Sequence, residues 1–271
     1  MQNLKRLFDF YIFSNIHVAV AMFSFAKISL LNFGIDENIT PLFVFFSTII
    51  SYNFIRSYKL NEINTFFAAW ISSHQKLLII LNILSTLLLA YLTFRIRFIS
   101  LLVLFPFIMT TFFYIVPFSA NKRNLRSIAG LKLFLIALTG AGVTVLFPLS
   151  QNEIDFDLNV WIIFFQRLLF IIAYTIPFDI HDMEDDHIHL KTMPQLYGVN
   201  RSKVIGSVSL LIFLILEFTK DPVNRHSVLQ TAILSLVTLF FLLFTRANQS
   251  RYYTTFWIEA LPIFWLLILI L

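Results

Sequence analysis

The 271-residue chain is too apolar for a soluble protein: 58% of its residues are hydrophobic and only 13% are charged, whereas soluble domains are about 45–50% apolar. It contains no Cys, which excludes disulfides and thiolate metal sites. The net charge of +5 follows membrane topology, as the distribution of basic residues below indicates, so we expect no nucleic-acid partner.

Apolar runs near 20 residues, enough to cross a hydrocarbon core of about 30 Å, recur along the chain. In order, they predict transmembrane helices over residues 10–32, 40–57, 76–94, 97–118, 128–149, 158–178, 203–218, 228–244 and 252–271. The N-terminal "MQNLKRLFDFYIF" lacks a small-residue cleavage site and is interpreted as the start of a retained span. "RIR" at 95–97 is the weakest separator between spans. We predict an all-α polytopic membrane bundle of nine helices, forming one domain over residues 1–271.

The basic residues predict the orientation of this bundle. With a cytoplasmic N-terminus, the inner segments hold 14 of the 20 Lys and Arg, and the outer segments hold Arg95, Arg97, Lys220 and Arg225. This asymmetry follows the positive-inside rule, and we expect an integral protein of a bacterial inner membrane. Two basic residues lie within spans: Lys27 is expected to snorkel outward, and Arg167 to pair with a buried acceptor or line a cavity.

An acidic cluster lies at the cytoplasmic end of the sixth span, in "FDIHDMEDDHIHLKTMP" at 178–194. Asp179, Asp182 and Asp186 are spaced i, i+3, i+7, which places them on one face of a helix. Such carboxylates repel one another unless a cation lies between them, and hard oxygen ligands without Cys indicate Mg²⁺. His181, His187 and His189 would suit zinc, but His181 is not on that face. A solvated acidic loop end is the simpler alternative, yet the helical spacing favours a metal–diphosphate site.

Basic residues that could bind a diphosphate lie in the inner loop between the fourth and fifth spans. They are Lys122, Arg123, Arg126 and Lys132, with Tyr114 at the end of the fourth span and Lys191 beside the carboxylates. Most of them would also satisfy the positive-inside rule alone. Lys132 differs because it follows Gly130 into a strongly apolar run, where a charge is expensive and usually functional. Further along that span, Gly140 and Gly142, with Pro148, permit close helix packing or a kink, and packing is the favoured interpretation.

The segments "DIHDMEDD" and "LKTMPQLYG" resemble the second aspartate-rich motif, DxxDxxxD, of the UbiA-type intramembrane prenyltransferases. Asp179, Asp182 and Asp186 match its acidic positions, and Gly198 matches the glycine that closes its loop. The resemblance implies nine helices, aspartate-rich motifs after the second and sixth spans, and a central cavity open sideways to lipid. It also implies Mg²⁺-dependent ionisation of an isoprenyl diphosphate and transfer of the prenyl group to an aromatic or lipid acceptor.

The first motif departs from the family pattern NxxxDxxxD. In "YNFIRSYKLNE" the corresponding residues are Asn53, Ser57 and Asn61, so the Asn is kept and both aspartates are replaced. Arg56 or Lys59 would supply positive charge there instead.

Two functions remain consistent with this pattern of residues. In the first, Asp179, Asp182 and Asp186 hold Mg²⁺ and are catalytic, while the substrate is bound by Asn53, Arg56, Tyr114, Lys122, Arg123, Arg126, Lys132 and Lys191. In the second, the chain is a catalytically impaired relative that binds a prenyl or lipid diphosphate without transfer. A transporter is disfavoured because the spans contain few polar residues, and a CDP-alcohol phosphotransferase because its motif needs DG and AR between the acidic positions.

Overall fold

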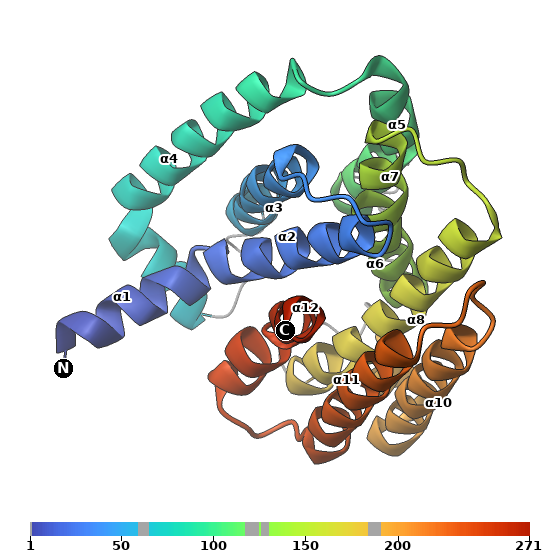
Figure 1. The fold of residues 1–271 in the computed structure, drawn as a ribbon. Coiled ribbons are helices and arrows are strands. Elements are labelled where there is room, and N and C mark those ends of the chain that lie inside the picture. Colours follow the sequence, from blue (N-terminus) through green and yellow to red (C-terminus); the bar gives the residue numbers. More distant parts are fainter. Residues whose placement is uncertain (1, 59–64, 117–124, 126–129, 184–190) are drawn as a thin grey trace.

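The computed structural model describes residues 2–58, 65–116, 125, 130–183 and 191–271, which form a helical bundle without β-strands (Figure 1). The predicted all-α class is confirmed. Within these ranges, seven helices are long and apolar enough to cross a membrane: Ile39–Arg56, Phe66–Thr93, Leu131–Gln151, Leu158–His181, Val199–Glu217, Arg225–Phe244 and Tyr253–Ile270. A bent pair of helices makes an eighth span, and Phe98–Tyr114 is a shorter apolar helix. The chain is therefore an integral membrane protein, and nine approximates its span count.

The predicted first span, 10–32, is two helices and not one. α1 (Gln2–Phe13) and α2 (Ile16–Leu31) meet at a 54° bend, and α1 projects away from the bundle (Figure 1). Asn15 lies in this bend with a left-handed φ of 69°, a conformation that Asn tolerates better than most residues. Periodicity of apolar residues continues across the bend, which is why the sequence alone did not reveal it.

α3 (Ile39–Tyr58) leads to α4 (Thr65–Thr93), which lies at the edge of the bundle (Figure 1). α4 begins at Thr65, well before the predicted start at 76. Its 29 residues span about 44 Å at 1.5 Å per residue, which exceeds the roughly 30 Å hydrocarbon core. α4 is therefore longer than an upright helix needs to be to cross the membrane core.

The separator "RIR" is confirmed, because α4 ends at Thr93 and α5 (Phe98–Ile115) begins after Arg97. The next span consists of α6 (Leu131–Ala141), a π-helical turn η2 (Gly142–Leu146) and α7 (Phe147–Gln151). A Cβ added at Gly142 would lie 2.1 Å from the Phe107 ring of α5, and one at Gly140 would lie 2.7 Å from Ile171 of α8. The predicted close packing at both glycines is confirmed.

α8 (Leu158–His181) forms the centre of the bundle, with 72% of its 18-residue apolar window buried. α10 (Val199–Glu217), preceded by the short α9 (Met193–Tyr197), packs along α8, and α11 (Arg225–Phe244) lies beside α10 (Figure 1). The last span is a π-helical turn η4 (Tyr253–Ile258) followed by α12 (Leu261–Ile270). Phe170 of α8 packs in an aromatic group with Phe25, Phe213 and Trp265.

Arg167 is completely buried in this core. Its Nη1 donates to the Phe25 carbonyl at 2.6 Å and to Thr144 Oγ1 at 3.1 Å, and its Nη2 donates to Ser29 Oγ at 3.2 Å. Its guanidinium also lies over the Phe25 ring (4.4 Å) and the Trp265 ring (5.0 Å). The prediction that Arg167 pairs with a buried acceptor is confirmed, and cation–π contacts compensate further for lost hydration.

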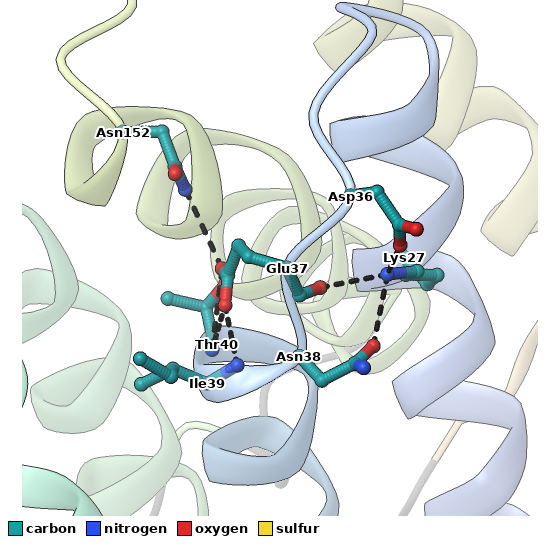
Figure 2. Close-up of polar contacts among 7 residues, drawn as sticks. All are labelled: Lys27, Asp36, Glu37, Asn38, Ile39, Thr40 and Asn152. Carbon is teal, nitrogen blue, oxygen red and sulfur yellow. Dashed lines mark hydrogen bonds and ion pairs between the residues drawn. The ribbon is translucent and has the colours of Figure 1, made fainter.

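The loops predicted to lie outside the membrane meet at one end of the bundle. Figure 2 shows the loop between α2 and α3, where Lys27 donates to Asp36, to the Glu37 carbonyl and to Asn38. Glu37 accepts from the Thr40 amide at the start of α3 and from Asn152 after α7. Lys27 is only 7% exposed, so the expectation that it snorkels was wrong: its ammonium is held under this loop.

Candidate functional site

Asp179 and Lys132 form an ion pair between α8 and α6. Lys132 Nζ lies 2.7 Å from Asp179 Oδ1, and Asp179 is 2% exposed. Gly130, with φ of +73°, lets the chain turn directly into α6, so that Lys132 falls in the first turn. The structure thus brings together two of the predicted site residues, which are 47 positions apart in the sequence.

Asp182 follows the last residue of α8. Its backbone amide still bonds to the Phe178 carbonyl at 2.9 Å, and its carboxylate lies 2.8 Å from His181 Nδ1 with the side chain 52% exposed. Because α8 ends at His181, the three acidic residues do not share one continuous helix as predicted. Asp179 is buried within the helix, Asp182 is exposed at its end, and Asp186 lies outside the described residues.

Arg56, near the end of α3, lies within electrostatic range of Asp182. Its Nη1 donates to the Phe13 carbonyl at 2.6 Å, and its guanidinium lies over the Phe67 ring of α4 at 5.3 Å. These contacts anchor the guanidinium between the bend after α1 and the start of α4. A cation of the first-motif helix is therefore held in a fixed position, and its charge interacts with Asp182 of the second motif.

Asn53, the residue kept from the first motif, is buried in a chain of three amides. Its Oδ1 accepts from Asn15 Nδ2 at 2.7 Å, and its Nδ2 donates to Asn82 Oδ1 at 2.9 Å. It thereby joins the bend between α1 and α2 to α3 and α4. The amide holds three helices together in this structure, and its predicted contact with substrate stays a prediction.

The remaining predicted residues are placed as follows. Tyr114 is half-buried in the last turn of α5 and lies within electrostatic range of Tyr52 of α3. Lys191 is exposed, with a positive φ of 44°, just before the capping box that Thr192 and Gln195 form at α9. Lys122, Arg123 and Arg126 lie outside the described residues.

Sequence reasoning missed three side chains whose charges interact with one another: Tyr52 of α3, Tyr174 of α8 and Glu259, which follows η4. Tyr52 is 39% exposed, and Tyr174 and Glu259 are half-buried. The available signal for Glu259 was its charge within the apolar run "WIEALPIF".

The two described carboxylates suit a hard divalent cation. Mg²⁺ binds through one or two carboxylates and completes its octahedron with water and phosphate oxygens, and Asp179 and Asp182 lie three residues apart at one helix end. Among the residues that the structure describes, there is no group of three His, Asp or Glu side chains that could hold a metal. The donor chemistry therefore fits Mg²⁺ shared with a phosphate ligand better than a closed, all-protein metal site.

A solved structure with this helix arrangement is the apo structure of a UbiA homolog from Aeropyrum pernix K1. The likeness has a TM-score of 0.70 and covers 94% of this chain and 99% of that chain, at 12% sequence identity. No protein-family model and no curated protein matches the sequence. The chain therefore has the UbiA fold, which confirms the fold that the aspartate motif implied; at this identity the likeness concerns fold and not activity.

Proposed function

We propose that the protein is a Mg²⁺-dependent intramembrane prenyltransferase that moves a prenyl group from an isoprenyl diphosphate to an aromatic or lipid acceptor. The observation that carries the proposal is the buried Asp179–Lys132 ion pair beside Asp182 and Arg56, at one end of a bundle with the UbiA fold. A buried, paired carboxylate next to an exposed one provides both a fixed and an adaptable oxygen ligand. Mg²⁺, when bound, supplies positive charge that stabilises the leaving diphosphate.

The chain's own residues supply the remaining charge. Lys132 compensates the buried carboxylate of Asp179 and fixes its orientation. Arg56, held by the Phe13 carbonyl, and the exposed Lys191 add further positive charge to the proposed site. We assign Asp186 to the same diphosphate site from the motif resemblance, and Lys122, Arg123, Arg126 and Tyr114 from their place at the predicted inner loop between the fourth and fifth spans.

A specific observation also favours the second candidate function, a relative that binds a lipid diphosphate without transfer. The first motif has lost both aspartates, and the amide of Asn53 is already engaged by Asn15 and Asn82. Only the second motif then remains to hold a metal ion. Ionisation of the prenyl diphosphate is therefore the step that the loss of the first motif would impair most. Binding and diphosphate release must therefore be measured separately.

The test uses purified protein in proteoliposomes made from bacterial total lipid extract, which supplies aromatic and lipid acceptors. Binding of geranylgeranyl diphosphate is measured with and without Mg²⁺, and diphosphate release is followed in the same samples. Asp182→Asn removes a ligand charge from an exposed position and leaves the buried ion pair intact. Asp155→Asn, in an exposed loop at the opposite end, is the matched control.

Under the transferase proposal, Mg²⁺-dependent binding and release occur in the natural protein and in Asp155→Asn, and both fall at least about 10-fold in Asp182→Asn, the loss of about 1.4 kcal/mol of interaction free energy. Binding without release would identify the non-catalytic relative. Absence of binding in the natural protein would reject the diphosphate site altogether.

A further inference from the structure

Glu259 owes its position to the π-helical turn η4 that precedes it. The Glu259 amide donates to the Thr254 carbonyl, five residues back, at 3.1 Å. Such a turn inserts one extra residue into a helix and is found frequently at functional sites. One residue corresponds to about 100° of rotation, so the side chain faces a different side of the helix from the one that α-helical periodicity gives.

The π-helical turn is held in place by the N-terminal helices. His17 Nε2 lies 3.0 Å from the Phe256 carbonyl, and His17 Nδ1 lies 2.8 Å from the Tyr11 hydroxyl. Because a carbonyl only accepts, Nε2 carries the hydrogen of this bond, and a neutral His17 then accepts from Tyr11 at Nδ1. Glu259 thus follows a turn whose carbonyl is fixed by α2.

A second contact holds the chain just before η4 begins. The Tyr252 hydroxyl donates to Asp9 Oδ1 at 2.6 Å. Burial and this hydrogen bond raise the pKa of Tyr252 to about 12, so the phenol remains a donor at physiological pH. A carboxylate that follows a doubly anchored turn is preorganised.

The surroundings of Glu259 connect it to the acidic site. The turn η4 that precedes it packs against α8, the helix whose last turn carries Asp179, and Glu259 is among the charges that act on Arg56 of α3 and Tyr174 of α8. In the described part of the chain, no residue forms a hydrogen bond or ion pair with the Glu259 carboxylate. An accessible carboxylate inside a membrane bundle, without a partner that satisfies it, is a functional group by default.

The contrast with Glu217 supports this interpretation. Glu217 is also a carboxylate on a span, but it accepts from Gln166 at 2.9 Å, from Lys220 at 2.7 Å and from Thr231 at 3.3 Å, and is 3% exposed. Its lone pairs are occupied by neighbours, as expected of a structural carboxylate. Glu259 differs in having both accessible surface and free acceptor capacity.

We propose that Glu259 is a catalytic residue, the base that receives the proton displaced from the acceptor during prenyl transfer. The assignment rests on the proposed function. In the reaction the C–O bond of the prenyl diphosphate breaks and the diphosphate leaves with its electron pair. A bond then forms between prenyl C1 and the acceptor atom, and the proton that this atom loses passes to the Glu259 carboxylate. The phenol groups of the neighbouring tyrosines are weak proton acceptors, so the carboxylate is the group that can take up this proton.

Glu259→Gln keeps the shape of the side chain and removes its ability to accept a proton. In the proteoliposome assay with geranylgeranyl diphosphate labelled at C1, we expect unchanged Mg²⁺-dependent binding and a fall of at least about 100-fold in kcat for labelled product, since a general base contributes about 10²–10⁴-fold. Glu259→Ala is expected to regain part of its rate with added formate. Such rescue would not occur if the carboxylate only stabilised the fold.

Glu217→Gln is the control, because it removes a carboxylate on a span that is outside the proposed site and is already satisfied by its neighbours. An equal loss of rate in Glu217→Gln, or the absence of formate rescue, would make the effect structural and overturn the assignment. Loss of diphosphate binding in Glu259→Gln would make Glu259 part of the diphosphate site instead of a base. Natural protein without turnover would reject the proposed function, whereas natural turnover that Glu259→Gln leaves unchanged would reject the role of Glu259 alone.

Discussion

Lys132 and Asp179 depend on each other because both are largely removed from water. Their atoms are 2.7 Å apart, with the side chains 13% and 2% exposed. The benefit of such a pair is small compared with an apolar pair of similar volume, but removing one partner leaves a buried charge without its compensation. Lys132 and Asp179 therefore contribute to the stability of the fold and are also assigned to the diphosphate site.

Lys132→Met is expected to destabilise the protein by about 3–5 kcal/mol, because it leaves the Asp179 charge buried. The double variant Lys132→Met with Asp179→Leu should recover most of this loss while abolishing diphosphate binding. Thermal unfolding in detergent, followed by size-exclusion chromatography, checks both. A double variant as unstable as Lys132→Met would contradict the electrostatic explanation.

Arg167 is a structural residue by its contacts. Its guanidinium binds the Phe25 carbonyl of α2 and Thr144 of η2 and lies against Trp265 of α12. Arg167→Lys keeps the charge but loses the planar fork that reaches two acceptors at once. We expect a loss of about 1–3 kcal/mol of stability, the cost of unsatisfied buried polar groups, visible as a lower unfolding temperature, with prenyl diphosphate affinity unchanged in the protein that remains folded. A weakened affinity would place Arg167 in the binding site.

At the scale of elements, the π-helical turns separate what the sequence could predict from what it could not. Apolar runs located the spans, and "RIR" at 95–97 separated α4 from α5. Neither pattern signals the extra residue in η2 or η4, because a π-helical turn leaves composition unchanged and is stabilised by tertiary contacts such as His17 with Phe256. The acidic motif was predicted, but Glu259 was not, since helical periodicity gives the wrong face after η4.

The turn η2 also has a steric requirement at its first residue. A Cβ at Gly142 would lie 2.1 Å from the Phe107 ring, which requires the ring or α5 itself to move. We expect Gly142→Ala to destabilise the protein by about 1–3 kcal/mol through overpacking. Adding Phe107→Leu should restore part of the stability by making room for the methyl group. If Phe107→Leu lowered the stability further, the close approach of α5 would not be the cause of the destabilisation. Unfolding temperatures of the two variants and the natural protein provide the comparison.

For the whole molecule, the loops predicted to share the outer side do lie together. Gln151 after α7 accepts from the Arg97 amide before α5 at 2.9 Å, and Asn159 at the start of α8 donates to the Asp221 carbonyl at 2.7 Å. Asn152 reaches Glu37 in the loop after α2. The alternation of loops predicted from charge is thus consistent with these contacts, although which end faces the cytoplasm depends on the positive-inside rule alone.

The absence of Cys makes that orientation directly testable, because a single introduced thiol is then the only one in the chain. Asp155→Cys lies in the loop predicted to be outside, and Asn200→Cys lies at the start of α10, predicted to be inside; both positions are exposed. We expect a membrane-impermeant maleimide to label Asp155→Cys in intact spheroplasts and Asn200→Cys only after permeabilisation. The reverse pattern would place the carboxylates Asp179 and Asp182 on the outer side. A cytosolic pool of isoprenyl diphosphate could then not reach them, and the donor assigned to this site would have to be a lipid diphosphate of the outer leaflet.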